Sequence, residues 1–260
     1  MDNLIKEHIQ NIFGCSSANF DKYPEIWMKN IELFIPQIFD LITINSNYKS
    51  NILNINNFNN TNITLKNLFD YYGSDKGNMY FPFYTTILEK YKNNETIRLL
   101  EIGLGTNNPN LISTMGNNGK YKCGGSLRAF RDYLPNGEIY GADIDLNCLF
   151  DENNINTFFV DQLNISTFDK LYLDCKSKKF DIIIDDGLHS IGANLNTILF
   201  SIKNINDKGI IIIEDIPITK INAYQIIDYV LTNNENKYKT TFVTYNNNND
   251  NGFLYIIEIV

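Results

Sequence analysis

The chain has 260 residues, of which 43% are hydrophobic and 13% aromatic, enough for one sizeable α/β domain with an added segment or for two small domains. Its net charge of -8, without a cluster of Lys and Arg, argues against a nucleic-acid groove, because neutralising phosphates requires grouped cations. Its four cysteines form no Cys-x-x-Cys pair, so we expect free thiols. Residues 1–14 lack the pattern of a signal peptide, and no apolar run reaches the roughly 20 residues that cross a bilayer. We therefore expect a cytoplasmic protein with no membrane partner.

Residues 1–95 are predicted to form a helical N-terminal segment. Helical spacing of apolar residues is clearest in EIWMKNIELFIPQIFDLI, residues 25–42, and the Asn-rich stretch at 45–62 is predicted to be a linker. The helix carries Trp27, Phe34 and Phe39, which suggests a homo-oligomer formed through this segment as a hypothesis.

Residues 96–260 show a different pattern, in which short apolar strands alternate with amphipathic segments. The predicted strands are IRLLEIG, EIYGADI, NTFFVD, FDIIIDD and GIIIIEDI, whose nearly continuous apolar runs are typical of a parallel sheet covered on both faces. KYKTTFVTY and GFLYIIEIV flank an Asn-rich turn and are predicted to form an antiparallel hairpin. The prediction is therefore a Rossmann-like α/β domain with a mostly parallel seven-stranded sheet.

Ligands of such sheets bind beyond the carboxyl ends of the strands, where this sequence collects its polar motifs. The first strand ends in Glu101, Gly103 and Gly105, and the glycines would allow a ligand to approach the backbone closely. Asn108 stands where a full dinucleotide fingerprint has its third glycine, so a plain tight turn explains this motif about as well.

Acidic and amide side chains follow the second and third strands. Asp143 and Asp145 are candidates to accept hydrogen bonds from a ribose diol, although a helix N-cap would also explain an aspartate there. Asp161 and Gln162 are candidates to contact an adenine edge or a metal ion.

The fourth and fifth strands are predicted to bring Asp185, Asp186, Glu214 and Asp215 to one edge. Four ionised carboxylates there require a counter-charge, and a set of oxygen ligands favours Mg²⁺ or Mn²⁺ over structural zinc. His189 is then a candidate general base beside the metal. Either acidic pair alone would be explained by solvated helix caps, whereas both pairs together with the histidine favour a site.

A loop of residues 105–126 separates the glycine turn from the next predicted helix. Loops of this length inside compact domains are usually functional, so a substrate lid is one hypothesis. The helix that follows begins near Ser126, and its N-terminus is polarised to receive an anion.

Several segments together resemble a known family. YYGSDKG, LLEIGLG, GGSLRAFRDYLPNGEIYGADID, VDQ, FDIIIDDGLHS and GIIIIEDI follow the order seen in S-adenosyl-L-methionine (SAM) dependent O-methyltransferases of the macrocin and mycinamicin type, which modify sugar hydroxyls. The resemblance covers about residues 70–216 and implies the class I methyltransferase fold.

The resemblance implies roles for individual residues. Asp186 with Glu214 or Asp215 would bind Mg²⁺ or Mn²⁺, and His189 would take the proton of the acceptor. Asp143 would hold the ribose of SAM. The other residues predicted to bind the cofactor are Ser74, Asp75, Lys76, Glu101, Gly103, Gly105, Ser126, Asp145, Asp161, Gln162 and Asp185.

The predicted function is a divalent-metal-assisted, SAM-dependent O-methyltransferase acting on a small molecule or on a glycan or nucleotide-activated precursor. A bacterial surface polysaccharide is one hypothesis for the product. GNMYFPFY and SIGANLN lack histidines that the family usually carries near these motifs, so the acceptor stays open. An NAD-linked oxidoreductase, which would prefer NADH to SAM, and a non-catalytic SAM-binding protein, which would need no metal, are the alternatives.

Overall fold

The computed structural model describes residues 24–45, 48–92, 96–111, 122–233, 237–247 and 250–260. The predictions on residues 1–14, the side chain of Trp27 and most of the proposed lid lie outside the described residues. Within these ranges, no helix combines the length and the apolar character that crossing a membrane requires. The cytoplasmic location stays a prediction.

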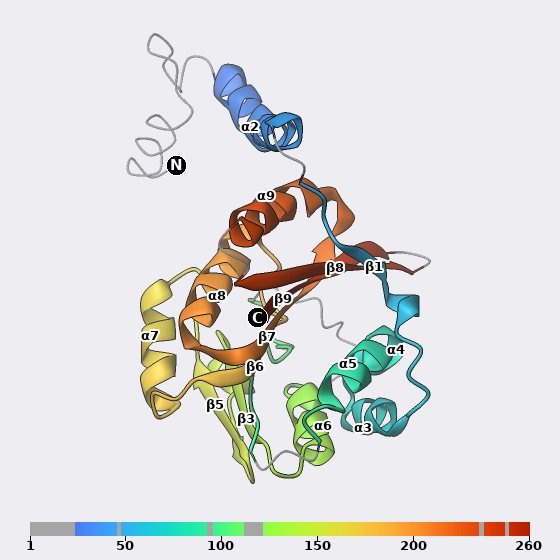
Figure 1. The fold of residues 1–260 in the computed structure, drawn as a ribbon. Helices are drawn as coiled ribbons and strands as arrows, with labels where there is room; N and C mark the ends of the chain where they lie inside the picture. Colours follow the sequence, from blue (N-terminus) through green and yellow to red (C-terminus); the bar gives the residue numbers. More distant parts are fainter. Residues whose placement is uncertain (1–23, 46–47, 93–95, 112–121, 234–236, 248–249) are drawn as a thin grey trace.

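A single sheet forms the centre of the described structure (Figure 1). In the described residues its strand order is β1-β8-β9-β7-β6-β2-β3-β5-β4, and β9 runs antiparallel to both β7 and β8. The seven predicted strands, the last two of which form the terminal hairpin, are confirmed, and two short edge strands, β1 and β4, extend the sheet. The strands are β1 (Ile52–Asn54), β2 (Arg98–Ile102), β3 (Glu138–Asp143), β4 (Asp151–Glu152), β5 (Ile155–Phe159), β6 (Phe180–Asp185), β7 (Ile205–Pro217), β8 (Tyr238–Asn247) and β9 (Asp250–Ile259).

Helices cover both faces of the sheet (Figure 1). Neighbouring strand residues such as Leu99 and Leu100 belong to different apolar clusters, as expected when successive side chains point to opposite faces. One face is covered by α3 (Thr64–Tyr72), α5 (Phe81–Leu88) and α6 (Gly125–Tyr133), and the other by α7 (Ile165–Asp174), α8 (Ile191–Asn204) and α9 (Ile221–Thr232). Shorter elements are α4 (Lys76–Met79), η1 (Ile55–Asn57), η2 (Leu146–Cys148) and η3 (Ile218–Lys220).

The N-terminal segment contributes to this core from Ile55 onward. The predicted linker instead contains β1, which pairs in parallel with β8, and the η1 turn, which Asn54 caps. Composition alone predicted a loop there, but pairing with the sheet edge outweighs the low strand propensity of asparagine. Phe69 of α3 and Tyr84 of α5 are fully buried against the sheet.

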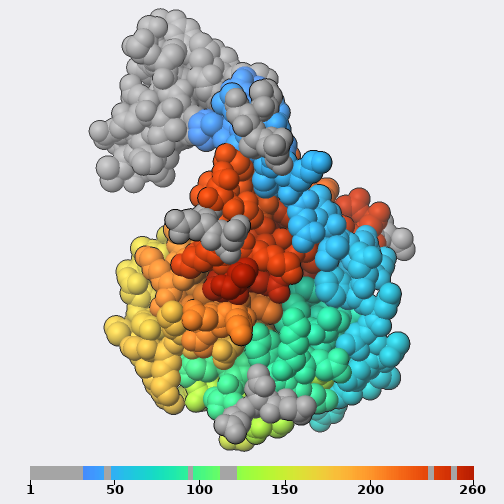
Figure 2. Space-filling view, in the orientation of Figure 1, coloured from blue at the N-terminus to red at the C-terminus, as the bar shows by residue number. Residues whose placement is uncertain are grey.

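The helix predicted at residues 25–42 is confirmed as α2 (Pro24–Asn45). Its described residues contact α9 and lie outside the main body in Figure 2. Phe34 is 42% exposed and Phe39 is half-buried. Self-association through this segment stays a prediction.

Candidate active site

A cavity of about 410 Å³ lies at the carboxyl ends of the central parallel strands. The segment from Gly73 to Lys76, which precedes and opens α4, closes one side of it. The predicted site residues that line the cavity are Ser74, Asp75, Lys76, Gly103, Gly105, Ser126, Asp143, Asp161, Gln162, Asp186, His189 and Asp215. Four others, Glu101, Asp145, Asp185 and Glu214, lie behind its wall.

The glycine turn after β2 is interlocked with the end of β6. Gly103 has a φ of 95°, and a Cβ atom built on it would stand 2.0 Å from the backbone oxygen of Asp186. The amide of Asp186 donates to the carbonyl of Ile102 at 2.8 Å. Glycine is therefore required at Gly103 both by its backbone angle and by this close approach.

Asp143 is held rigidly at the end of β3. Its two carboxylate oxygens accept from the amides of Leu104 and Asp145, both at 2.7 Å. Burial raises the pKa of Asp143, and these backbone donors oppose that rise. Asp145 does not line the cavity; it accepts from the amide of Asn147 at 3.0 Å and caps η2, as the N-cap alternative predicts.

Asp185 and Gln162 together support the loop that follows β6. The side-chain amide of Gln162 donates to Asp185 at 2.8 Å, and its oxygen accepts from the amide of Leu188 at 2.7 Å. Asn194 of α8 donates to the other oxygen of Asp185 at 2.9 Å. Asp185 therefore does not join the carboxylates that surround Lys76. Glu101 is found among them instead.

The acidic cluster is organised around Lys76. Its ammonium lies 2.5 Å from Asp186, 2.6 Å from Glu214 and 3.4 Å from Glu101. Lys76, Glu101 and Glu214 are each at least 98% buried. Lys76 is one of the residues predicted to bind the cofactor, and in the structure its ammonium pairs with three carboxylates.

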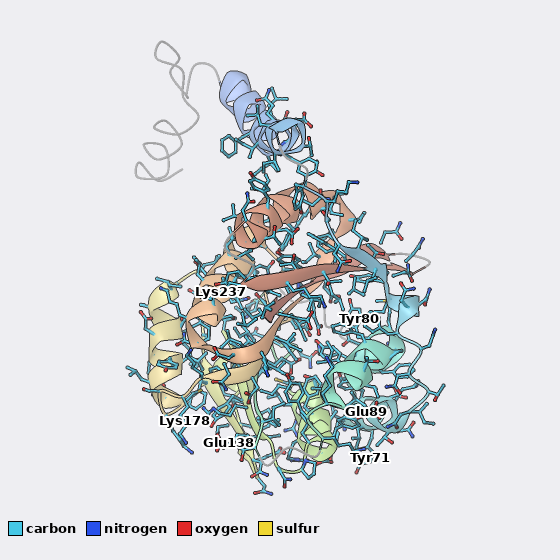
Figure 3. The ribbon with its side chains drawn as sticks, in the orientation of Figure 1. Tyr71, Tyr80, Glu89, Glu138, Lys178 and Lys237 are labelled. Atoms are coloured by element: carbon cyan, nitrogen blue, oxygen red, sulfur yellow. The ribbon has the colours of Figure 1, made fainter. Side chains whose placement is uncertain are left out.

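Two tyrosines from the same segment complete the cluster, and the sequence prediction missed them. The hydroxyl of Tyr84 donates to Glu214, and that of Tyr80, labelled in Figure 3, donates to Asp215. Their signal in the sequence is a spacing of four residues directly after the GSDKG motif, which places two hydroxyls on one side of a helical segment.

Burial and crowding set the charge states of the cluster. Burial raises the pKa of Glu214 to about 7, against the opposing effect of Lys76. Burial and the neighbouring carboxylates hold the pKa of Asp186 well above its ordinary value. Burial alone would lower the pKa of Lys76, but Asp186, Glu214 and Glu101 together raise it well above its ordinary value. One ammonium therefore serves several crowded carboxylates, whose raised pKa values favour the protonated forms, and a further cation beside them would favour the ionised forms.

Asp186, His189 and Asp215 form a group open to the cavity, with potential ligand atoms all within 4.8 Å of one another. Two carboxylates and an imidazole suit a divalent cation such as Mn²⁺ and fit Mg²⁺ through their oxygens. Both oxygens of Glu214, a predicted ligand, are instead engaged by Lys76 and Tyr84. The metal-ligand and general-base roles stay predictions.

Two members of this group have unusual backbone conformations. His189 and Asp215 have φ values of 51° and 52°, the left-handed region that non-glycine residues rarely adopt. The register shift between β7 and β9 around Ile213 and Ile216 accommodates Asp215. Such strain is concentrated at functional sites, where surrounding contacts enforce it.

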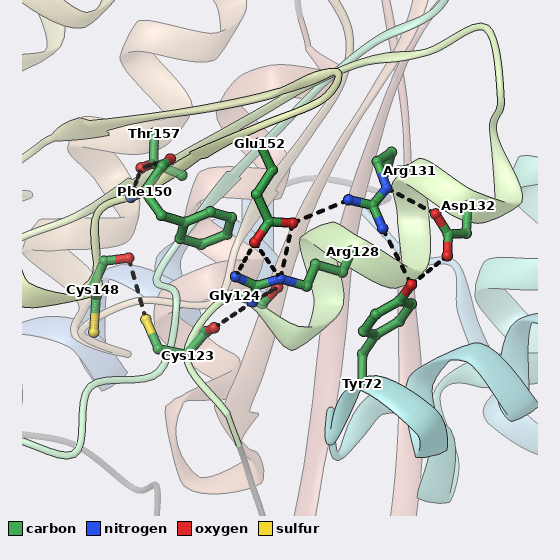
Figure 4. Close-up of polar contacts among 10 residues, drawn as sticks. All are labelled: Tyr72, Cys123, Gly124, Arg128, Arg131, Asp132, Cys148, Phe150, Glu152 and Thr157. Atoms are coloured by element: carbon green, nitrogen blue, oxygen red, sulfur yellow. Dashed lines mark hydrogen bonds and ion pairs between the residues drawn. The ribbon is translucent and has the colours of Figure 1, made fainter.

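The start of α6, which lines the cavity, is fixed by Arg128 (Figure 4). Its guanidinium donates to the carbonyls of Cys123 and Gly124 at 2.9 and 3.3 Å and to Glu152 at 2.6 Å. It also lies 4.1 Å from the centroid of the Phe150 ring. These contacts connect the described end of the loop and the start of α6 to β4 and the residue before it.

The strand order, with antiparallel β9 between β7 and β8, and a cavity at the carboxyl ends of the strands define the class I methyltransferase fold. The structure is similar to that of the MycE methyltransferase of the mycinamycin pathway, solved with Mg and SAH. The TM-score is 0.55 at 22% identity, covering 75% of this chain and 54% of that chain.

Sequence comparison confirms the resemblance to macrocin- and mycinamicin-type enzymes. The chain is 33% identical over 135 residues to the mycinamicin VI 2''-O-methyltransferase of Micromonospora griseorubida, covering 52% of this chain and 30% of that protein. It is 32% identical over 136 residues to the demethylmacrocin O-methyltransferase of Streptomyces fradiae, covering 52% and 31%. The matches thus span about a third of these relatives, and no protein-family model matches the chain.

Proposed function

We propose that this protein is a SAM-dependent O-methyltransferase assisted by a divalent cation. The observation that carries the proposal is a single cavity that joins the glycine turn at Gly103 to the Asp186–His189–Asp215 group. A cofactor bound at the turn would direct its reactive end toward the residues that would remove the proton from the acceptor hydroxyl.

The cofactor side of the cavity would be formed by backbone at Gly103 and Gly105 with the carboxylates of Asp143 and Asp161. SAM supplies a methyl group carried on a sulfonium sulfur. Asp143 lines the cavity in an orientation fixed by its two backbone donors, which suits it to receive a ribose hydroxyl without reorganisation. Ser74 and Asp75 would close this side from the N-terminal segment.

The acceptor side would be formed by Asp186, Asp215 and His189. Asp186 and Asp215 would hold a divalent cation, which would lower the pKa of the acceptor hydroxyl and leave the imidazole of His189 available as the base. The imidazole of His189 lines the cavity at 19% side-chain exposure and would accept the hydroxyl proton. Asp186, 3.8 Å from Nε2 of His189, would stabilise the imidazolium that results.

For the acceptor, we propose a hydroxyl group of a glycosylated small molecule. The names of the relatives, which concern mycinamicin VI and demethylmacrocin, support this class over a precursor of a surface polysaccharide. A nucleotide-activated glycan precursor is the second class to screen.

Calorimetric titration of SAM and of its demethylated product, with Mg²⁺ and then with EDTA, tests the cofactor side. We expect micromolar binding and, with Mg²⁺, a metal-dependent heat; NADH should give none. Binding of NADH but not SAM would favour an oxidoreductase, and metal-independent SAM binding without turnover would favour a non-catalytic SAM-binding protein.

The His189→Ala variant tests the acceptor side with radiolabelled SAM and a panel of glycosylated acceptors. It should keep the SAM affinity of the wild type and lose turnover, because the imidazole acts on the acceptor and not on the cofactor. Full turnover would remove His189 as the base.

A further inference from the structure

We propose that Lys220 is a positioning residue that holds His189 in its working orientation. This inference rests on the proposed function, because it assigns a support to the residue that would accept the proton. The observation is one hydrogen bond, from the ammonium of Lys220 to the backbone oxygen of His189, at 2.8 Å.

The backbone of His189 needs such a support. Its φ of 51° is unfavourable for a residue with a Cβ atom and persists only where neighbouring contacts enforce it. The residues on either side are fixed independently: the amide of Leu188 donates to Gln162 at 2.7 Å, and Ser190 caps α8. Lys220 adds a bond to the strained residue itself.

The conformation of this residue decides where the imidazole points. In the structure Nε2 lies 3.8 Å from Asp186, and His189 shares the cavity wall with Asp186 and Asp215. A return to an ordinary negative φ would redirect the Cα–Cβ bond of His189 and carry the ring away from Asp186. A bond to the backbone oxygen opposes this rotation without touching the ring.

Lys220 is placed to act only through His189. It is the last residue of η3 and is not among the described residues that line the cavity, so its effect on cofactor and acceptor would pass through His189. It follows Asp215 by five residues on the chain that leaves β7. Residues 215–220 therefore make two contributions. Asp215 is itself part of the Asp186–His189–Asp215 group, and Lys220 donates the hydrogen bond that restrains His189.

Steady-state kinetics of Lys220→Met, Lys220→Arg and His189→Ala test the inference. Loss of a charge-assisted hydrogen bond should lower kcat about tenfold in Lys220→Met while KM for SAM stays unchanged. Lys220→Arg should recover most of the rate, because its guanidinium can donate to the same oxygen. Lys239→Met, which changes a 65% exposed lysine on β8, should match the wild type.

Combining the variants separates positioning from general damage. Adding Lys220→Met to His189→Ala should not lower the residual turnover that single-turnover assays with excess enzyme detect in His189→Ala, because both changes remove one function. A kcat of Lys220→Met within twofold of the wild type, or a further tenfold loss on the His189→Ala background, would overturn the inference.

Hydrogen–deuterium exchange keeps the test independent of catalysis. Amides of residues 187–190 should exchange faster in Lys220→Met than in wild type and Lys239→Met, even if no acceptor is methylated. Unchanged exchange would overturn the inference. Absence of SAM binding and turnover in the wild type would instead overturn the proposed function. Should Lys220→Met fail to fold, the same measurements on Lys220→Gln replace it.

Discussion

Replacing Gly103 with alanine is the most direct test of how the glycine turn builds the site. The new Cβ atom would stand 2.0 Å from the backbone oxygen of Asp186 and 2.5 Å from its carbonyl carbon. Because these atoms belong to the backbone, no side chain can rotate to relieve the clash. The ends of β2 and β6 must move apart.

The cost has two parts. A positive φ of 95° is unfavourable for alanine by about 1–2 kcal/mol. Overpacking a tightly packed region costs about 1–3 kcal/mol more. We therefore expect Gly103→Ala to lower the free energy of unfolding by about 2–5 kcal/mol and to abolish SAM binding, since the displaced strand end carries Asp186.

Urea denaturation and SAM calorimetry measure these two effects. Gly192→Ala is the matched control: no atom lies within 4 Å of the position of its new Cβ, and it stands in the first turn of α8. It should stabilise the protein by about 0.5–1 kcal/mol and leave SAM binding intact. Equal stability of Gly103→Ala and the wild type would refute the close approach of the two strand ends.

Two further predictions concern the acidic cluster. Because the pKa of Glu214 rises from 4.5 to about 7 on folding, the native state keeps a proton that the unfolded state has lost, and unfolding free energy measured in EDTA should fall by about 3 kcal/mol between pH 4.5 and 7. Glu214→Gln should make the slope shallower by this amount and leave the part that the raised pKa of Asp186 contributes, and an unchanged slope would assign all of it to other groups. Lys76→Met leaves buried carboxylates uncompensated and should cost about 3–5 kcal/mol in urea unfolding. Lys66→Met breaks an exposed pair with Asp70 and should cost less than about 1 kcal/mol, and equal costs would contradict the burial of Lys76.

The sheet could be predicted from the sequence because burial on both faces leaves a simple pattern. Ile182, Ile183 and Ile184 of β6 are fully buried, and strands of this kind appear as continuous apolar runs. The carboxyl ends of parallel strands lie at one edge, so the prediction that Asp186 and Asp215 meet followed from topology alone. Both line the cavity.

The direction of each acidic side chain could not be predicted in the same way. Asp185 and Asp186 are adjacent, and a strand turns neighbouring side chains to opposite faces, but the sequence does not say which one reaches the cavity. In the structure Asp185 accepts hydrogen bonds from Gln162 and Asn194, whereas Asp186 accepts one from Lys76. These partners come from segments that are distant in the sequence. The apolar pattern of a strand does not indicate which distant residue will contact its polar end. The same holds for β1, whose pairing with β8 cannot be seen in an Asn-rich stretch.

The origin of Lys76 explains why the N-terminal segment and the sheet depend on each other. Glu101 and Glu214 come from β2 and β7 and are almost completely buried, and the ammonium between them comes from α4. Without the N-terminal segment, both carboxylates would lose the buried ammonium, at a cost of several kcal/mol, and the apolar face under α3 and α5 would be exposed to water. Protonation could relieve the charge, but it would also remove the negative potential that a divalent cation requires. We therefore infer that residues 64–88 and the sheet fold as one unit, and that the same ammonium that makes the acidic cluster stable also orients Asp186 toward the cavity.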